Sequence, residues 1–235
     1  MDSRKNIYLM AGGRGTRSAR TLMQAIFREI NKPRPEMAYI GAASGDDKTF
    51  FGFIGNMIKS GGDCTIKQVL LSSPKADINL AKQILQNSDA IFMSGGDVEA
   101  GMQVLQERQL VSFIQELSAT GKLFFGASAG SIMLAEKWVR WTDPEDDSSA
   151  ELFPCLGIAP VICDTHAEKD DWEELKWALK LEKAGVTGYG IPTGSCLKIT
   201  PNHRLETLGG PVARFHRKKL SVERMEDLLP ENSKT

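Results

Sequence analysis

Short apolar runs alternate along the chain with segments whose apolar residues recur at helical spacing. Gly, Pro and Asp bound the apolar runs, which is typical of buried strands. We therefore expect strands at Asn6–Met10, Met37–Ala43, Thr65–Ser72, Asp89–Ser94, Lys122–Ala127, Pro160–Cys163, Gly188–Pro192 and Cys196–Ile199.

Three segments between these runs place apolar residues on one face of a helix. The stripes are Leu80, Ala81, Ile84 and Leu85, then Leu110, Phe113, Ile114 and Leu117, and then Trp172, Leu175 and Leu179. Gly185 is expected to cap the third helix at its C-terminus. Strands alternating with helices predict an α/β fold, a mostly parallel sheet with helices on both faces. We expect a single domain over residues 1–235, with its core at residues 6–212 and a C-terminal tail after residue 220.

Composition and charge narrow the class of protein. Hydrophobic residues make up 41% and charged residues 25%, as in an ordinary globular chain. The net charge of -1 gives no reason to expect nucleic acid as a partner. Because no apolar run reaches the ~20 residues needed to cross a bilayer, and the N-terminus has no signal-peptide pattern, we expect a cytoplasmic protein without membrane contact.

Two charged stretches and four cysteines are interpreted in the plainest way. The basic stretch Arg214–Lys219 and the acidic loop Thr142–Ser149 are expected to be solvated surface, the loop rather than a metal site. The cysteines have neither C-x-x-C nor Cys/His metal spacing, so reduced buried thiols are expected. We expect no metal and no cofactor.

A glycine- and alanine-rich turn follows one of the predicted strands. Residues Gly126–Gly130 read Gly-Ala-Ser-Ala-Gly, after the apolar run Lys122–Phe125 and before the helix formers of Ser131–Lys137. This strand–turn–helix context is what the G-x-S-x-G nucleophile elbow requires. Small residues are needed two positions on either side of the serine because larger ones would collide with neighbouring backbone. A helix beginning there would also favour developing negative charge. We therefore interpret Ser128 as the nucleophile of a serine hydrolase.

A serine nucleophile needs a base, and the chain offers three histidines. His203 lies in Pro201–Arg204, a sequence typical of a hairpin turn, and His216 lies in the basic stretch. His166 follows an apolar run, which places it at the carboxyl end of a strand. We expect it at the same edge of the parallel sheet as the elbow, where α/β folds build their sites. Elimination selects His166 as the base.

Backbone N–H groups are expected to form an oxyanion hole. Ala129, directly after the serine, supplies one donor. Gly95 and Gly96 end another predicted strand, and their lack of side chains lets the backbone approach a ligand. Gly96 is our choice for the second donor.

These pieces together resemble the peptidase E and cyanophycinase family of serine peptidases. The matching blocks, in order, are Ile40–Ser44, Ala90–Asp97, Gly126–Gly130 and Leu156–Ile158 leading into Asp164–His166. The resemblance implies a class I glutamine amidotransferase-like fold and a small peptide or amide as substrate. It also implies Ser128 as nucleophile, His166 as base, the amides of Gly96 and Ala129 as oxyanion donors, and no cofactor.

The sequence departs from this family in the group expected to orient the histidine. Family members carry a glutamate where this chain has Thr193, whose hydroxyl bears no charge. A carboxylate partner fixes the histidine tautomer and stabilises the imidazolium. Glu168 is our choice for the third member, with Asp164 as a further candidate. We also expect Gly95, Asp97 and Thr193 to contact the substrate.

A second departure concerns specificity. The segment after the histidine usually bears arginines in this family, whereas residues Ala167–Glu174 are largely acidic here. An arginine can hold an acidic substrate side chain bidentately, and an acidic segment cannot. We therefore expect the substrate to be neutral or basic near this wall.

Other functions fit parts of the sequence. The missing glutamate leaves open a catalytically impaired homologue that binds a small molecule or peptide. The glycine-rich segment Leu9–Arg17 looks like the opening loop of sugar-phosphate nucleotidyltransferases, although the rest of that pattern is not visible. A glutaminase is disfavoured because that chemistry uses cysteine at the elbow. A monomer or a homodimer is expected.

Overall fold

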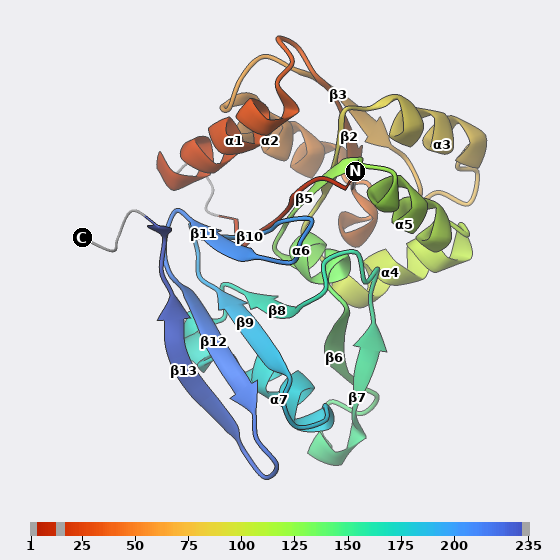
Figure 1. The fold of residues 1–235 in the computed structure, drawn as a ribbon. Helices are drawn as coiled ribbons and strands as arrows, with labels where there is room; N and C mark the ends of the chain where they lie inside the picture. Colours follow the sequence, from red (N-terminus) through yellow and green to blue (C-terminus); the bar gives the residue numbers. More distant parts are fainter. Residues whose placement is uncertain (1–3, 13–16, 232–235) are drawn as a thin grey trace.

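The computed structural model describes residues 4–12 and 17–231 and has an α/β fold built around two sheets (Figure 1). The larger sheet has seven strands in the order β11-β10-β1-β5-β4-β2-β3. β1, β5, β4, β2 and β3 run parallel, whereas β10 is antiparallel to both of its neighbours, β1 and β11. The strands are β1 Ile7–Met10, β2 Glu36–Ile40, β3 Thr65–Val69, β4 Ala90–Met93, β5 Leu123–Ala127, β10 Cys196–Ile199 and β11 Leu205–Leu208.

Helices cover both faces of the larger sheet, as the strand–helix alternation predicts. Alternate residues of each strand face opposite sides; Tyr8 and Met10 pack with the first helices, and Ile7 and Leu9 with the later ones. α1 (Arg17–Ile30) and α2 (Lys48–Lys59) form one layer. The other layer contains α3 (Ile78–Asn87), α4 (Val98–Glu107), α5 (Val111–Ala119) and α6 (Ala129–Leu134).

A smaller, four-stranded sheet in the order β13-β12-β9-β8 follows in the C-terminal half. The two strands of this sheet that come first along the chain, β8 (Ile162–Thr165) and β9 (Thr187–Ile191), are parallel to each other. α7 (Glu173–Leu181) packs on this sheet through a separate apolar cluster. A hairpin of β6 (Lys137–Trp141) and β7 (Ala150–Pro154) packs nearby, and short 3₁₀ turns lie at η1 Ala42–Ser44, η2 Asp147–Ser149 and η3 Glu168–Asp170.

Two expectations about the C-terminal half are wrong. Residues after 220 do not form a tail, because Val222–Leu228 is strand β13, paired with β12 (Val212–Arg217). β13 lies at a sheet edge and is mostly exposed, so its sequence carries no apolar run. Gly185 does not cap the helix, which ends at Leu181; its N–H instead donates to the Arg217 carbonyl.

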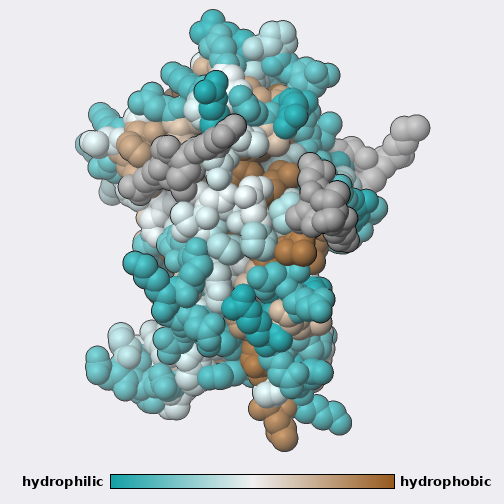
Figure 2. All heavy atoms as spheres, turned by 90° about the vertical axis from the view of Figure 1, so that its left-hand side faces the viewer, coloured by the Kyte–Doolittle hydropathy of each residue, from teal (hydrophilic) through white to brown (hydrophobic). Residues whose placement is uncertain are grey.

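The face that carries the β12–β13 hairpin is mostly hydrophilic (Figure 2). The hairpin turn bears Leu220, which is 97% exposed. Single exposed apolar side chains of this kind are normal on folded proteins. In the described part of the chain, no helix has the length and apolarity required for a bilayer span.

Candidate active site

Ser128 lies in the sharp turn between β5 and α6, where the sequence predicts an elbow. Its backbone has φ 54° and ψ -130°, a strained conformation for a residue with a side chain. Its N–H donates to the Met10 carbonyl at 2.9 Å, which ties the turn to the neighbouring strand β1. α6 ends at Leu134, before the predicted Lys137, so the elbow is followed by a short helix of six residues. The backbone turn, rather than a long helix dipole, defines the elbow.

The glycines on either side of Ser128 are required by close backbone contacts. A Cβ atom on Gly130 would lie 2.1 Å from the Met93 carbonyl oxygen of β4. A Cβ atom on Gly126 would lie 2.7 Å from the Gly130 carbonyl carbon. Both distances are shorter than any tolerated carbon contact, and the obstructing atoms are backbone. The steric reason given for the small residues of the motif therefore holds in the structure.

His166 reaches Ser128 from the smaller sheet. It follows β8 and has φ 45°, and its N–H donates to the Ile191 carbonyl of β9 at 2.9 Å. The expectation that both residues lie at one edge of one parallel sheet is wrong, because β5 and β8 belong to different sheets. The two sheets nevertheless bring the side chains together: Ser128 Oγ and His166 Nε2 are 2.7 Å apart, within hydrogen-bond distance.

The loop after His166 is fixed by a buried tryptophan. Trp172 is 3% exposed, and its N–H donates to the Ala167 carbonyl at 3.0 Å. Its ring occupies the space above Gly190 of β9, where a Cβ atom would lie 2.5 Å from Trp172 Cδ2. Trp172 therefore anchors this loop to the smaller sheet, and His166, at the start of the loop, reaches Ser128 from there.

Gly96 and Ala129, which the sequence predicts as oxyanion donors, both line the pocket that contains Ser128. Ala129 is the first residue of α6, so its N–H has no acceptor within the helix. Gly96 lines the same pocket as Ser128 and has φ 141°. A Cβ atom on Gly96 would overlap the Ala43 carbonyl oxygen at 1.9 Å, so only glycine fits against the η1 turn. Gly95 packs beneath the serine, with its Cβ position 3.1 Å from Ser128 Cβ.

Glu168 and Thr193 meet each other rather than His166. Glu168 Oε1 accepts a hydrogen bond from the Thr193 N–H at 2.7 Å, across two loops. Within residues 4–12 and 17–231, no group makes a hydrogen bond to His166 Nδ1. Glu168 thus connects the histidine loop to the loop after β9, and its role as third member of a triad stays a prediction.

The serine and histidine line a pocket of about 420 Å³. Its wall takes residues from the loops that follow β4, β5 and β8, from the strands β6 and β8, and from the helices α4, α6 and α7. The expected substrate contacts are divided: Asp97 lines the pocket, whereas Gly95 and Thr193 are not among its described lining residues. Asp97 also caps α4, accepting a hydrogen bond from the Ala100 N–H at 2.8 Å. The lining residues are Gly96, Asp97, Val98, Ser128, Ala129, Ile132, Trp138, Asp164, Thr165, His166, Ala167, Asp170 and Glu174.

The pocket is acidic at the end formed by β8 and α7. Asp164 is 5% exposed, and burial, with smaller effects from Glu174 and Asp170, raises the pKa of its carboxyl to about 7. Burial also raises the pKa of Glu174, whose Oε2 accepts a hydrogen bond from Trp138 Nε1 at 2.7 Å. Sequence reasoning missed Trp138, which reaches the pocket only through the packing of the hairpin.

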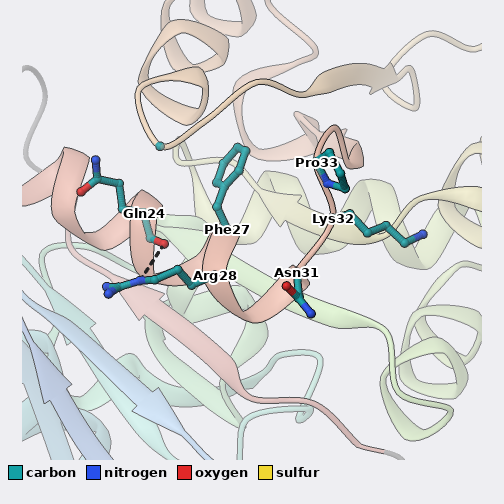
Figure 3. Close-up of a pocket in the computed structure, with 7 residues that line it drawn as sticks. Gln24, Phe27, Arg28, Asn31, Lys32 and Pro33 are labelled. Atoms are coloured by element: carbon teal, nitrogen blue, oxygen red, sulfur yellow. Dashed lines mark hydrogen bonds between the residues drawn. The ribbon is translucent and has the colours of Figure 1, made fainter.

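A larger pocket of about 740 Å³ lies at the opposite end of the parallel strands (Figure 3). It is lined by the end of α1 and the loop that leads into β2. Arg28 and Lys32 extend in opposite directions, Arg28 donating to the Gln24 carbonyl at 3.3 Å and Lys32 pairing with Asp89. Its described lining contains no nucleophile beside a base. The Ser128 pocket, by contrast, places a serine hydroxyl beside a histidine.

A serine on a strand–helix turn with a histidine on its hydroxyl is an arrangement found in α/β serine hydrolases. The model of peptidase family S51 matches residues 7–207, and the chain therefore belongs to this peptidase family. Within the described residues, no group of three or more His, Cys, Asp or Glu side chains is arranged to hold a metal ion.

Solved structures share the fold at low sequence identity. A peptidase from an acI-B1 Actinobacterium is 18% identical, with a TM-score of 0.73 over 97% of this chain and 98% of its own. A putative peptidase E protein from Listeria monocytogenes EGD-e is 15% identical, with a TM-score of 0.62 over 87% of this chain and 98% of its own. No curated protein matches the chain.

Proposed function

We propose that the protein is a serine peptidase of the peptidase E type that cleaves small peptides or related amides through an acyl-enzyme on Ser128. The observation that carries the proposal is the 2.7 Å distance between Ser128 Oγ and His166 Nε2 at a strained elbow. Membership of peptidase family S51 supports the reaction class. Residues 13–16 of the glycine-rich segment that looks like a nucleotidyltransferase loop lie outside the described residues.

The acylation step uses the two side chains in sequence. Ser128 Oγ attacks the substrate carbonyl carbon while its proton passes to His166 Nε2, which must be the unprotonated ring nitrogen. The carbonyl oxygen becomes an oxyanion that the N–H groups of Gly96 and Ala129 stabilise. His166 then gives the proton to the leaving amine as the carbon–nitrogen bond breaks.

Deacylation repeats the same transfers with water. His166 Nε2 takes a proton from water, whose oxygen attacks the acyl carbon, and returns it to Ser128 Oγ as the ester bond breaks. The products are a carboxylic acid, an amine and the free serine. The packed loop orients the His166 ring in place of a carboxylate on Nδ1. Ile191, Trp172 and the Glu168–Thr193 hydrogen bond hold this loop in position.

A serine-directed fluorophosphonate tests the proposal directly. We expect the wild-type protein to be labelled at Ser128 and the Ser128→Ala variant to lose the label, as followed by intact-mass spectrometry. Ser112→Ala, which removes an exposed serine on α5, should label like the wild type. A wild-type protein that takes up no label between pH 6 and 9 would instead favour the impaired, ligand-binding homologue.

Hydrolysis itself is tested with short substrates. A panel of N-terminally free dipeptides and aminoacyl amides should include acidic, neutral and basic residues on the acyl side of the cleaved bond. The acidic wall predicts turnover of neutral or basic substrates over Asp-containing ones. A clear preference for Asp-X peptides would contradict this specificity without contradicting the role of Ser128.

A further inference from the structure

Two buried hydroxyl groups lie behind the loop that follows β4, and the proposed reaction uses neither. Tyr39 of β2 is 0% exposed, and Ser94, the first residue after β4, is 1% exposed. Tyr39 Oη and Ser94 Oγ are 2.7 Å apart. The Tyr39 ring packs against Phe51 and Phe92, with ring centroids 5.0 Å and 5.6 Å away, which fixes the position of its hydroxyl. A buried hydroxyl pair of this kind rigidifies the groups that it joins.

The hydroxyl pair ends on the peptide that joins Gly95 to Gly96. Ser94 Oγ donates to the Gly95 carbonyl oxygen at 3.4 Å, a long hydrogen bond. Because a serine hydroxyl has one proton to donate, the proton of the 2.7 Å contact comes from Tyr39. Burial raises the pKa of the Tyr39 phenol, which therefore stays protonated at neutral pH. The hydrogen bonds thus run in one direction, from Tyr39 to Ser94 and from Ser94 to the Gly95 carbonyl.

The position of the Gly95 carbonyl determines where the Gly96 N–H points. The C=O and N–H groups of one trans peptide point in opposite directions, and the described residues contain no cis peptide. Since Ser94 holds the Gly95 carbonyl on the buried side, the Gly96 N–H points away from that side. Gly96 lines the Ser128 pocket, and in the described part of the chain no acceptor takes its N–H. An N–H in this orientation is free to donate to an oxyanion.

This peptide can be reversed, because both of its residues are glycine. Gly96 has φ 141°, and a glycine reaches either orientation at little cost. The chain on both sides of the peptide is fixed, since the Ser94 N–H donates to the end of β2 at 3.0 Å and the Asp97 N–H donates to the η1 turn at 2.8 Å. Among the described residues, the Gly95 carbonyl has no hydrogen-bond donor other than Ser94 Oγ. Rotation of the peptide would direct this carbonyl toward the pocket, where it would repel an oxyanion.

We propose that Tyr39 and Ser94 are positioning residues that keep the oxyanion hole formed, by holding the Gly95 carbonyl away from the pocket so that the Gly96 N–H faces it. Both hydroxyls act through the peptide and neither touches the substrate. The effect on catalysis rests on the proposed function, whereas the orientation of the peptide does not. Ser94→Ala removes the group that holds the carbonyl, and Tyr39→Phe leaves that group free to rotate, so the first change should have the larger effect.

Steady-state kinetics with the best substrate of the dipeptide and amide panel is the first test. The oxyanion forms only as the reaction proceeds, so loss of its donor lowers kcat and leaves KM nearly unchanged. We expect kcat to fall about 100-fold in Ser94→Ala and about tenfold in Tyr39→Phe, with KM within about twofold of the wild type. A kcat of Ser94→Ala within about twofold of the wild type overturns the proposal.

Tyr8→Phe is the matched control. Tyr8 lies on β1 of the same sheet and is 3% exposed, and its hydroxyl donates to Glu29 rather than to a group of the site. The change removes an equally buried hydroxyl, so it should lower stability in urea denaturation and leave kcat unchanged. If Tyr8→Phe lowers kcat as far as Tyr39→Phe does, the effect is general destabilisation and the proposal fails.

Crystal structures of the wild type and of Ser94→Ala test the orientation of the peptide without any turnover. We expect the Gly95 carbonyl to face Ser94 in the wild type and to turn toward the pocket in Ser94→Ala. The same orientation in both structures overturns the proposal whatever the activity. If Ser94→Ala does not fold, Tyr39→Phe decides by the same two measurements and the same outcomes. A turned peptide, found where the wild type shows neither fluorophosphonate labelling nor turnover, would refute the hydrolase and leave the positioning of the peptide.

Discussion

The two proposed catalytic side chains are held by different kinds of structure. Ser128 lies on the larger sheet, in a turn fixed by backbone contacts to the adjacent strands β1 and β4. His166 comes from the smaller sheet, on a loop held by one backbone hydrogen bond to Ile191, the packed ring of Trp172 and the side chain of Glu168. We call the elbow around Ser128 the serine side of the site and the loop that starts at His166 the histidine side. The serine side is held by its main chain, whereas the histidine side depends on side chains that can be substituted one at a time.

Removing the histidine should have the largest effect. We expect His166→Asn to lower kcat/KM by about 1000-fold, because general acid–base catalysis typically contributes between 100- and 10,000-fold. Asparagine tolerates the positive φ of this position, so the backbone of the loop should be kept. The rate is measured with the best substrate of the dipeptide and amide panel.

His203→Asn is the matched control for this change. His203 also has a positive φ, 62°, but lies exposed in the turn between β10 and β11. It should retain wild-type kcat/KM. A loss of less than about tenfold in His166→Asn would show that His166 is not the base.

The serine side was the more predictable from sequence. Its strands are buried on both faces, so they appear as continuous apolar runs, and the elbow has a local motif. In the smaller sheet, the edge strand β13 is mostly exposed and shows little alternation of apolar and polar residues, so the sequence predicts a tail where the structure has a strand. The partnership of Ser128 and His166 is consistent with elimination among three histidines, although the sheet assigned to His166 was wrong.

The parts of the site that the sequence did not predict come from packing over long separations. Trp138 approaches Glu174 only because the β6–β7 hairpin packs beside α7. Glu168 and Thr193 were each named as site residues, but their mutual hydrogen bond joins loops 25 positions apart. Neither contact leaves a periodic or motif signal in the sequence.

A methyl group added to the elbow tests the rigidity of the serine side. We expect Gly130→Ala to lower the free energy of unfolding by about 3 kcal/mol, because the new Cβ would meet the Met93 carbonyl at 2.1 Å and strand backbone cannot give way cheaply. Urea denaturation measures the change. Gly52→Ala, in the middle of α2 with nothing within 4 Å, should stabilise the protein by up to about 1 kcal/mol. Similar stabilities of the two variants would contradict a rigid elbow.

The charge at the histidine side should appear in the pH dependence of stability. Burial raises the pKa of Asp164 to about 7, above the ordinary value in the unfolded chain. The folded state therefore binds the proton more tightly, so this group's contribution falls as pH rises from about 4 to 7 and is constant above that range. Glu174 and Asp170 face the same carboxyl, and both remain in an Asp164→Asn variant.

The comparison of wild type with Asp164→Asn isolates that contribution. Between pH 8 and pH 5 the wild type should gain about 2 kcal/mol relative to the variant, as measured by urea denaturation at each pH. Gly130→Ala keeps Asp164, so its stability difference from the wild type should stay constant over the same pH range. A stability difference that is constant from pH 5 to 8 would mean that Asp164 is ionised normally in the folded protein.

The smallest expected effect separates two roles for Glu168. If its task is to accept the Thr193 N–H and so position the loop of His166, Glu168→Ala should lower kcat about fivefold, whereas Glu168→Gln, which keeps an acceptor oxygen, should retain most of the activity. If Glu168 instead swings to His166 Nδ1 as the charged member of a triad, alanine and glutamine should both lower kcat by far more and shift its acidic pH limb. Lys169→Ala, its exposed neighbour in η3, is the control and should leave the rate unchanged. Because glutamine removes the charge and preserves the hydrogen bond, the ratio of the two variants decides whether the histidine side is held by geometry alone or by a carboxylate.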